Sequence, residues 1–268
     1  MKILAMDSSG LVASAAIIED DVMRAEYTMN YKKTHSQTLL PMIDEIVKMT
    51  ETDLNSIDAI AVAGGPGSFT GLRIGSATAK GLGLALDKPL VSVPTVQGLA
   101  YNYQGFTQLI CPIMDARRGQ VYTGIYRFHG RDCEIIKEQC AISIEELMEA
   151  LTEAWSGQPG LPQEVVFLGD GVPVHQSYIE EYWEKSEKQV SFAPPHMNGQ
   201  RAGSLAMCAM QMYKEGRTET AAEHHPDYLR LSQAEREKAE REKAEREKTE
   251  REKTEREKAA HGEAKCES

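Results

Sequence analysis

The sequence predicts an α/β protein built from two similar lobes, and two observations carry this prediction. Short apolar runs typical of strands precede helical patterns, and this order occurs once in residues 1–105 and again after them. The roughly 230 residues before a repetitive end are enough for one large or two small domains. We therefore expect a first lobe at 1–105, a second lobe at 106–232 and a separate charged tail at 233–268.

The first lobe is predicted to open with a three-stranded meander, because apolar runs alternate with short polar turns. A helix with an apolar stripe follows, and two more strands then frame a second helix. Strands are predicted at 2–6, 11–18, 22–29, 58–63 and 89–93, and helices at 34–50, 68–87 and 95–103.

The second lobe repeats this alternation of strands and helices. Its strands are predicted at 108–114, 120–128, 133–140 and 164–168, and its helices at 143–154, 174–184 and 204–213. Glu145 and Glu146 suit the first turn of the helix at 143–154, because carboxylates stabilise the positive end of the helix dipole.

The stretch from Ala61 to Asp87 organises the first lobe. It predicts a buried strand, a glycine turn and a long helix that Ser68 or Thr70 can cap. Four glycines fall inside this helix, and each costs on the order of 1 kcal/mol relative to alanine. A glycine without a Cβ lets another backbone lie against the helix, so close approach is the physical reason that we expect. These glycines are Gly71, Gly75, Gly81 and Gly83.

Two polar turns of the first lobe could face a phosphate group. One follows the first strand, and the other precedes a helix, whose free N–H groups attract anions. The candidate nucleotide-facing residues are Asp7, Ser8 and Ser9 in the first turn, and Gly65, Gly67 and Ser68 in the second. Neither turn is a P-loop or a G-x-G-x-x-G motif, and an ordinary turn that binds nothing is the alternative for each.

The helix at 34–50 carries more apolar surface than one core face needs. Leu40, Met42 and Met49 widen its apolar stripe. Because methionine repacks easily, the surplus favours a partner surface, and a helix buried on two sides within its own lobe is the alternative. His35 has no second histidine, cysteine or acidic cluster beside it, which argues against a metal site there.

Charge and cysteine content restrict the partners and the compartment. The formal net charge is −11, and the tail contributes only −1 through twelve Glu against five Arg and six Lys. An acidic body binds nucleic acid poorly by direct contact. The five cysteines show no paired spacing, which indicates a reducing compartment, and no apolar stretch reaches membrane-spanning length. We expect a cytoplasmic protein without a membrane partner.

The tail has a composition of its own. Residues 234–258 repeat a five-residue unit of Glu, Arg, Glu and Lys led three times by Ala and twice by Thr. Glu237 and Arg241 illustrate its pairs at a spacing of four, which stabilise a helix by a few tenths of a kcal/mol each. The repeat has no apolar stripe for a coiled coil, so we expect a solvated, partly helical extension.

Several segments together resemble one family. The combination is specific, although no single segment is, and the similarity covers essentially residues 1–237. The family is TsaB, also called YeaZ. The segments are 3–9, 64–75, 114–122, 169–171, 226–230 and 232–237.

The resemblance implies the fold of the actin, sugar-kinase and Hsp70 (ASKHA) group, with two related lobes that each hold a mixed sheet. TsaB proteins are non-catalytic partners of TsaD, which transfers a threonylcarbamoyl group to the adenosine beside the anticodon of tRNAs that read codons beginning with A. The ATPase TsaE joins them. The resemblance therefore implies a subunit that pairs with TsaD, forms a homodimer when alone and reaches tRNA only through the complex. It implies no cofactor of its own, with ATP or ADP at the interface of the complex.

The resemblance also bears on catalysis. TsaD holds its metal with two histidines four residues apart, and these positions correspond here to Thr95 and Leu99. The chain has no histidine between His35 and His129, so we expect no catalytic and no metal-ligating residues. The rival hypothesis is an ATP-dependent small-molecule kinase of the same fold. It would need the two turns and a third, Gly169 to Gly171, to face one cleft.

In the family, helices of the first lobe form the interface with TsaD and with a second copy of the chain. The resemblance assigns this role to the broad surface of the helix at 34–50 and to the close-approach face of the glycine-rich helix. The predicted interface residues are Leu40, Met42, Met49, Gly71 and Gly75.

Overall fold

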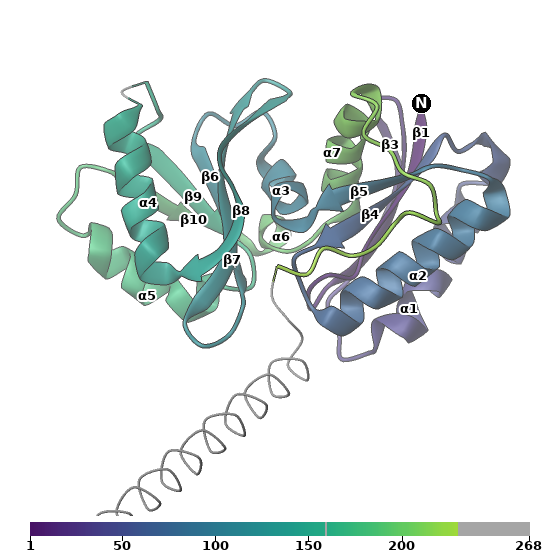
Figure 1. Cartoon of the computed structure of the whole chain (residues 1–268), viewed down its shortest axis with the longest axis horizontal. Coiled ribbons are helices and arrows are strands. Elements are labelled where there is room, and N and C mark those ends of the chain that lie inside the picture. Colours follow the sequence, from purple (N-terminus) through teal and green to yellow (C-terminus); the bar gives the residue numbers. More distant parts are fainter. Residues whose placement is uncertain (159, 230–268) are drawn as a thin grey trace, which may run out of the picture. The chain divides into compact units, whose positions relative to one another are not determined.

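Two five-stranded mixed sheets form the framework of the chain (Figure 1). In this computed structural model residues 1–158 and 160–229 are described, and Met1–Leu229 makes up one compact unit. The charged tail predicted at 233–268 lies outside the described residues.

The first sheet has the order β3-β2-β1-β4-β5. The three strands of the predicted meander pair antiparallel, whereas β4 and β5 join β1 in parallel. Parallel neighbours need a crossover, and the helices between these strands supply it. The strands are β1 (Lys2–Asp7), β2 (Ala13–Glu19), β3 (Val22–Met29), β4 (Ala59–Gly65) and β5 (Leu90–Pro94).

The second sheet repeats the first, with the order β8-β7-β6-β9-β10 and the same sequence of antiparallel and parallel pairs. This duplication confirms the predicted two-lobed ASKHA fold. The strands are β6 (Leu109–Asp115), β7 (Gln120–His129), β8 (Asp132–Ser143), β9 (Glu164–Leu168) and β10 (Gln189–Phe192).

Helices cover both faces of each sheet. In β1, Leu4 and Met6 pack in the cluster with α1 (His35–Met49) and α2 (Phe69–Leu86), whereas Ile3 and Ala5 face the cluster with α7 (Ala202–Lys214). This alternation is the expected consequence of a strand that is buried on both faces. The second sheet is covered on its outer face by α4 (Ile144–Gly157) and α5 (Val172–Trp183).

The helix α7 follows the second sheet in the chain but packs on the first. Two backbone N–H groups at the start of α7 donate to side chains of the first sheet. Ala202 N donates to Ser14 Oγ at 2.9 Å, and Gly203 N donates to Glu26 Oε1 at 2.9 Å. The lobe boundaries at 105 and 232 remain predictions. They assign α7 to the second lobe, although this helix packs on the first sheet.

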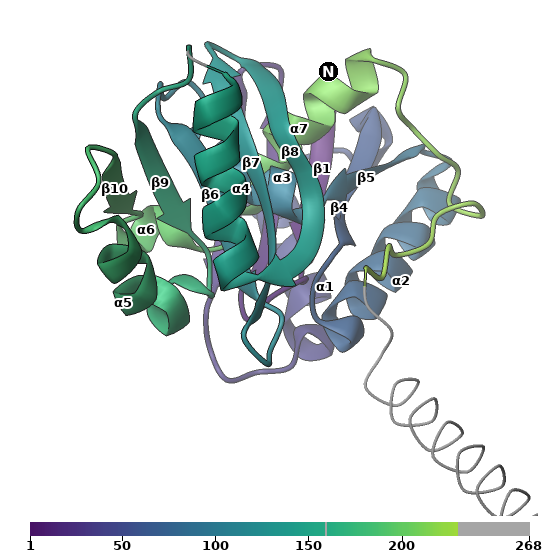
Figure 2. The same cartoon turned by 60° about the vertical axis from the view of Figure 1, so that its left-hand side comes forward.

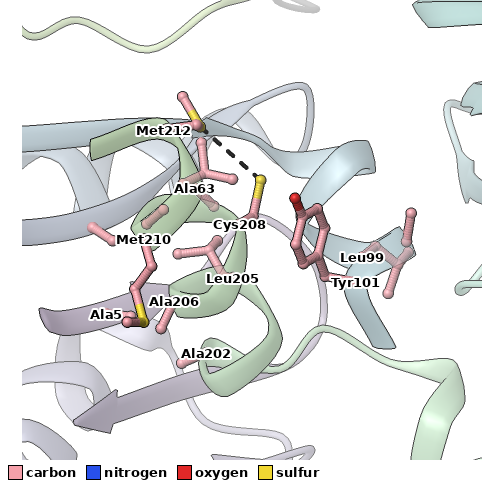
Figure 3. Packing of buried hydrophobic residues seen from close by; sticks show 14 of the residues in the cluster. Ala5, Ala63, Leu99, Tyr101, Ala202, Leu205, Ala206, Cys208, Met210 and Met212 are labelled. Atoms are coloured by element: carbon pink, nitrogen blue, oxygen red, sulfur yellow. Dashed lines mark hydrogen bonds between the residues drawn. The ribbon is translucent and has the colours of Figure 1, made fainter. Parts of the chain in front are cut away.

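A single hydrophobic cluster joins the two sheets. It lies around α7 and α3 (Thr95–Ala100), which stand between the sheets in both views (Figure 1 and Figure 2). Figure 3 shows Cys208 of α7 between Met212 and the Tyr101 ring, with Leu99 on the other side of Tyr101. The ring of Tyr101 also meets Phe128 of the second sheet edge-on, with centroids 5.1 Å apart. The lobes therefore share a core.

Short elements complete the chain, and the sequence did not predict all of them. The 3-10 helices η1 (Leu54–Ser56) and η2 (Tyr101–Tyr103) lie in connections, and α6 (Pro195–Asn198) links β10 to α7. The sequence analysis missed η1, β10 and α6, while the other strands and helices lie within three residues of their predicted bounds. Among the described helices, none combines the length and the apolar character needed to cross a membrane.

Candidate functional site

The turn after β1 is closed by its own side chains. Asp7 Oδ1 accepts hydrogen bonds from Ser9 N at 2.8 Å and from Ser9 Oγ at 2.6 Å. All three side chains of the turn, Asp7, Ser8 and Ser9, are buried. Burial raises the pKa of Asp7, and the two hydrogen bonds from Ser9 oppose that shift. The turn has the geometry of an Asx turn, which fits the alternative of an ordinary turn that binds nothing.

The glycine turn and the start of α2 pack directly against this first turn. Ser68 N donates to the Ser9 carbonyl at 2.6 Å, and Ser8 Oγ donates to the Gly71 carbonyl at 2.8 Å. A Cβ at Gly67 would lie 2.4 Å from the Ser9 carbonyl oxygen. The structure therefore brings the two predicted turns together, but it fills the space between them with backbone.

Gly65 is enclosed by residues outside the two turns. Its N–H donates to Thr95 Oγ1 at 3.1 Å, and its carbonyl accepts from Gln139 Nε2 of β8 at 3.2 Å. Its φ is +121°, and a Cβ there would lie 2.1 Å from the carbonyl oxygen of Asp227. Asp227 belongs to the C-terminal strap, residues 219–229, which sequence analysis missed as a structural element.

The third turn, Gly169 to Gly171, is bound to the end of β6. Asp170 Oδ1 accepts from Asp115 N at 3.0 Å, and Gly171 N donates to the Ile113 carbonyl at 3.0 Å. Burial raises the pKa of Asp170. The two lobes are thus alike in this respect. In the first lobe the turn after β4 bonds to the turn after β1, and in the second lobe the turn after β9 bonds to the end of β6.

A nucleotide phosphate would need free N–H groups in these turns. The amides of Gly65 and Ser68 already donate within the chain, and the Asp227 backbone faces Gly65. The candidate residues Asp7, Ser9 and Ser68 serve one another instead. The amides of Gly65 and Ser68 are therefore not available to a phosphate, and the geometry does not favour the kinase hypothesis.

The two positions that correspond to the TsaD histidines have structural roles. Thr95 is buried and accepts the Gly65 N–H, and Leu99 belongs to the core shared by the two sheets. Within residues 1–158 and 160–229, no group of three or more His, Cys, Asp or Glu side chains could hold a metal ion.

The five predicted interface residues divide into two groups. Leu40 and Met49 of α1 are 55% and 76% exposed, so their side chains are available to a partner. Met42 is only 2% exposed and packs in the core of its own lobe, because α1 contacts both the sheet and α2. Met42 thus follows the alternative of a helix buried within its own lobe, whereas a partner surface at Leu40 and Met49 stays a prediction.

Gly71 and Gly75 also lie inside the lobe rather than on its surface. A Cβ at Gly71 would come within 2.0 Å of the Ser8 carbonyl oxygen, and one at Gly75 within 2.7 Å of Ser8 Oγ. The close approach of another backbone that was predicted for this helix is confirmed at Gly71, where the neighbour is the turn after β1. At Gly75 the nearest neighbour is a side chain of that turn, and at Gly81 the prediction is wrong, because nothing lies within 4 Å. The assignment of Met42, Gly71 and Gly75 to a partner surface is corrected by their burial.

Comparisons with known proteins find relatives along most of the chain. The family model "TsaD: tRNA N6-adenosine threonylcarbamoyltransferase" matches residues 23–238. The tRNA threonylcarbamoyladenosine biosynthesis protein TsaB of Bacillus subtilis (strain 168) is 34% identical over 238 residues, which are 88% of this chain and 96% of that protein. The TsaB protein of Escherichia coli (strain K12) is 30% identical over 244 residues, 87% of this chain and 96% of that protein.

A solved structure extends the likeness to three dimensions. YeaZ from Pseudomonas aeruginosa is 25% identical and superposes with a TM-score of 0.68, over 85% of this chain and 99% of that chain. Similarity to two TsaB proteins along nearly their whole length, a matching family model and a matching fold show that the chain belongs to the TsaB (YeaZ) family.

Proposed function

We propose that this chain is the non-catalytic subunit that pairs with a TsaD protein in the synthesis of threonylcarbamoyladenosine in tRNA. In this role it supports transfer of the threonylcarbamoyl group to the adenosine beside the anticodon of tRNAs that read codons beginning with A. The observation that carries the proposal is the similarity to two TsaB proteins over 96% of the length of each.

The geometry of the turns supports a structural role for them. Asp7, Ser9 and Ser68 bond to one another, and the position of Gly65 is fixed by Thr95 and by Gln139. Because the amides of Gly65 and Ser68 already donate within the chain, they are not available to a phosphate. Catalysis in the proposal belongs to TsaD.

The proposal includes the partners and the location. The chain contacts TsaD through the exposed surface of α1, which includes Leu40 and Met49, and forms a homodimer when TsaD is absent. TsaE joins the complex, tRNA is reached through the complex, and the assembly works in the cytoplasm. The chain has no cofactor of its own, and ATP or ADP binds where the subunits meet.

Reconstitution tests the proposal. The full chain and TsaD from the same organism are co-purified, their mass is measured by light scattering, and modified adenosine is measured by mass spectrometry after incubation with TsaE, ATP, threonylcarbamoyl-adenylate and tRNA. We expect a stable complex, and modification only when both subunits are present. Modification by this chain alone, or failure of the two chains to associate, would overturn the proposal.

Calorimetry with ATP and magnesium tests the kinase hypothesis separately. For the isolated chain we expect no heat of binding, because the turn amides are already bonded. Tight binding accompanied by ATP turnover would instead support a kinase.

A further inference from the structure

Three side chains form a cluster at the start of α2, in which Arg73 and Tyr228 are exposed and Phe69 is half-buried. The guanidinium carbon of Arg73 lies 3.9 Å from the centre of the Phe69 ring, and the Phe69 and Tyr228 ring centres are 4.8 Å apart. Arg73 Nε also donates to the Tyr228 hydroxyl at 3.4 Å. Phe69 and Arg73 are one helical turn apart, whereas Tyr228 comes from the C-terminal strap. We call these three residues the Arg73 cluster.

The strap that carries Tyr228 runs alongside α2 (Figure 1 and Figure 2). Its first residue, Glu219, pairs with Leu90 of β5 through two backbone hydrogen bonds. Further along, Lys80 Nζ donates to the His224 carbonyl at 2.8 Å, and Asp227 N donates to the Gly64 carbonyl at 2.7 Å.

A buried side chain, that of His224, also helps to fix the strap. The His224 side chain is fully buried, and its Nδ1 lies 2.6 Å from Glu219 Oε1. Ala221 packs beside Gly83 near the end of α2. Because the strap is fixed at several points, the Arg73 cluster is preformed, and a partner that binds it loses less conformational freedom on binding.

The guanidinium of Arg73 retains free hydrogen-bonding capacity. Arg73 is exposed, and its one hydrogen bond among the described residues uses Nε, so both terminal nitrogens remain available. Within the described part of the chain, no carboxylate forms an ion pair with it. A planar guanidinium that is held on an aromatic ring matches an oxyanion with two parallel hydrogen bonds.

The surroundings distinguish between the two sources of such an oxyanion. Asp227 directly precedes Tyr228 in the strap, and the whole chain has a net charge of −11. An RNA backbone needs a wide basic footprint, whereas a carboxylate needs only one well-placed guanidinium such as that of Arg73. Arginine and tyrosine are instead enriched among the residues that dominate protein interfaces.

We propose that the Arg73 cluster is an anchor for a carboxylate side chain of a protein partner. The inference rests on the proposed function, under which this partner is TsaD. The carboxylate binds the two terminal nitrogens of Arg73, and the exposed edge of Tyr228, which is 37% exposed, packs against the neighbouring apolar surface of the partner.

Binding of the full chain to TsaD, measured by calorimetry, tests the inference. Arg73→Ala is expected to weaken binding by about tenfold or more. Arg73→Lys should lose most of the affinity as well, because an ammonium keeps the charge but cannot form the stacked fork. The matched control is Arg217→Ala, an exposed arginine just after α7 that pairs with Glu215, and it should change the affinity by less than about twofold.

The outcomes separate this inference from the proposed function. Normal binding by Arg73→Ala overturns the anchor but leaves the proposed function intact, whereas no binding by the natural chain overturns both. Binding by Arg73→Lys equal to that of the natural chain also overturns the anchor, since any point charge would then suffice. If Arg73→Ala keeps TsaD but the assembled complex loses tRNA in a filter-binding assay, the oxyanion is RNA phosphate and the carboxylate assignment is wrong.

Discussion

Two glycines of α2 show how differently the same residue type can be constrained. A Cβ at Gly71 would meet the Ser8 carbonyl oxygen at 2.0 Å, whereas a Cβ at Gly81 would meet nothing within 4 Å. We expect Gly71→Ala to lower the free energy of unfolding by about 2–3 kcal/mol, because the obstacle is backbone and cannot move easily. Gly81→Ala should raise it by up to about 1 kcal/mol through helix propensity alone.

Urea unfolding of the two variants checks this pair. Each is the control of the other, since both add one methyl group to the same helix. Changes of the same sign and size would mean that propensity, and not the contact with Ser8, sets the stability at Gly71.

Asp7 should make stability depend on pH in an unusual direction. Burial raises its pKa in the folded chain above the value of about 3.9 in the unfolded chain. The folded chain therefore holds this proton more tightly. The stabilisation from the neutral carboxyl is present at low pH and is lost as the pH rises through the folded-state pKa.

Asp7→Asn tests this dependence, because its side-chain oxygen can still accept both hydrogen bonds from Ser9. Relative to the natural chain, the variant should gain unfolding free energy as the pH rises from 4 to 7. Urea titrations at several pH values measure the difference, and a difference that stays constant over this range would contradict the burial argument.

At the scale of elements, α7 depends on one carboxylate for its docking. Glu26 accepts from Gly203 N at 2.9 Å, and from Arg201 Nε and Nη2 at 3.1 and 2.5 Å. Glu26→Ala leaves a helix N–H and an arginine without their acceptor, so we expect a loss of about 2–3 kcal/mol in unfolding free energy. The surface carboxylate Glu134 should cost less than about 1 kcal/mol when replaced by alanine. Equal losses in thermal unfolding would argue against a docking role for Glu26.

The helix α1 separates a structural face from an exposed face. Met49→Asp places a charge on a side chain that is largely exposed, so the melting temperature should stay within a few degrees while binding to TsaD weakens at least severalfold. Met42→Asp buries an unpaired carboxylate and should unfold the chain or lower its melting temperature sharply. Calorimetry and thermal melts distinguish the two, and unchanged affinity of Met49→Asp would remove this face of α1 from the proposed interface.

The periodicity of α1 could be predicted from the sequence, but the depth of each side chain could not. Met42 and Met49 both widen the apolar stripe, and only the packing of α1 against the sheet and α2 shows that the first is buried. The strand β10 was missed because its four residues, Gln189–Phe192, hold too few alternations to stand out from a polar region. Similarly, glycine inside α2 indicates a close neighbour without identifying it.

At the scale of the whole molecule, the two similar lobes followed from the alternation of strands and helices, but the strand order of the sheets and the shared core of the lobes did not. The contacts that join them are long-range, such as the bond from Gln139 to Gly65 and the packing of Tyr101 on Phe128. No local pattern predicts that the strap would cover Gly65 either. The candidate turns were therefore located correctly in the chain, while the contacts that occupy them became visible only in the folded structure.

Truncation tests whether the chain is one cooperative unit. A chain that ends at 200 lacks α7 and the strap, which leaves one face of the first sheet uncovered and removes the helix around which both sheets share a core. We expect it to be insoluble or to lack a cooperative thermal transition, because this face loses its apolar burial. A chain that ends at Gln233 keeps all described residues and should melt within a few degrees of the full chain. A cooperative transition of the shorter chain at the natural midpoint would show that the first lobe folds without α7.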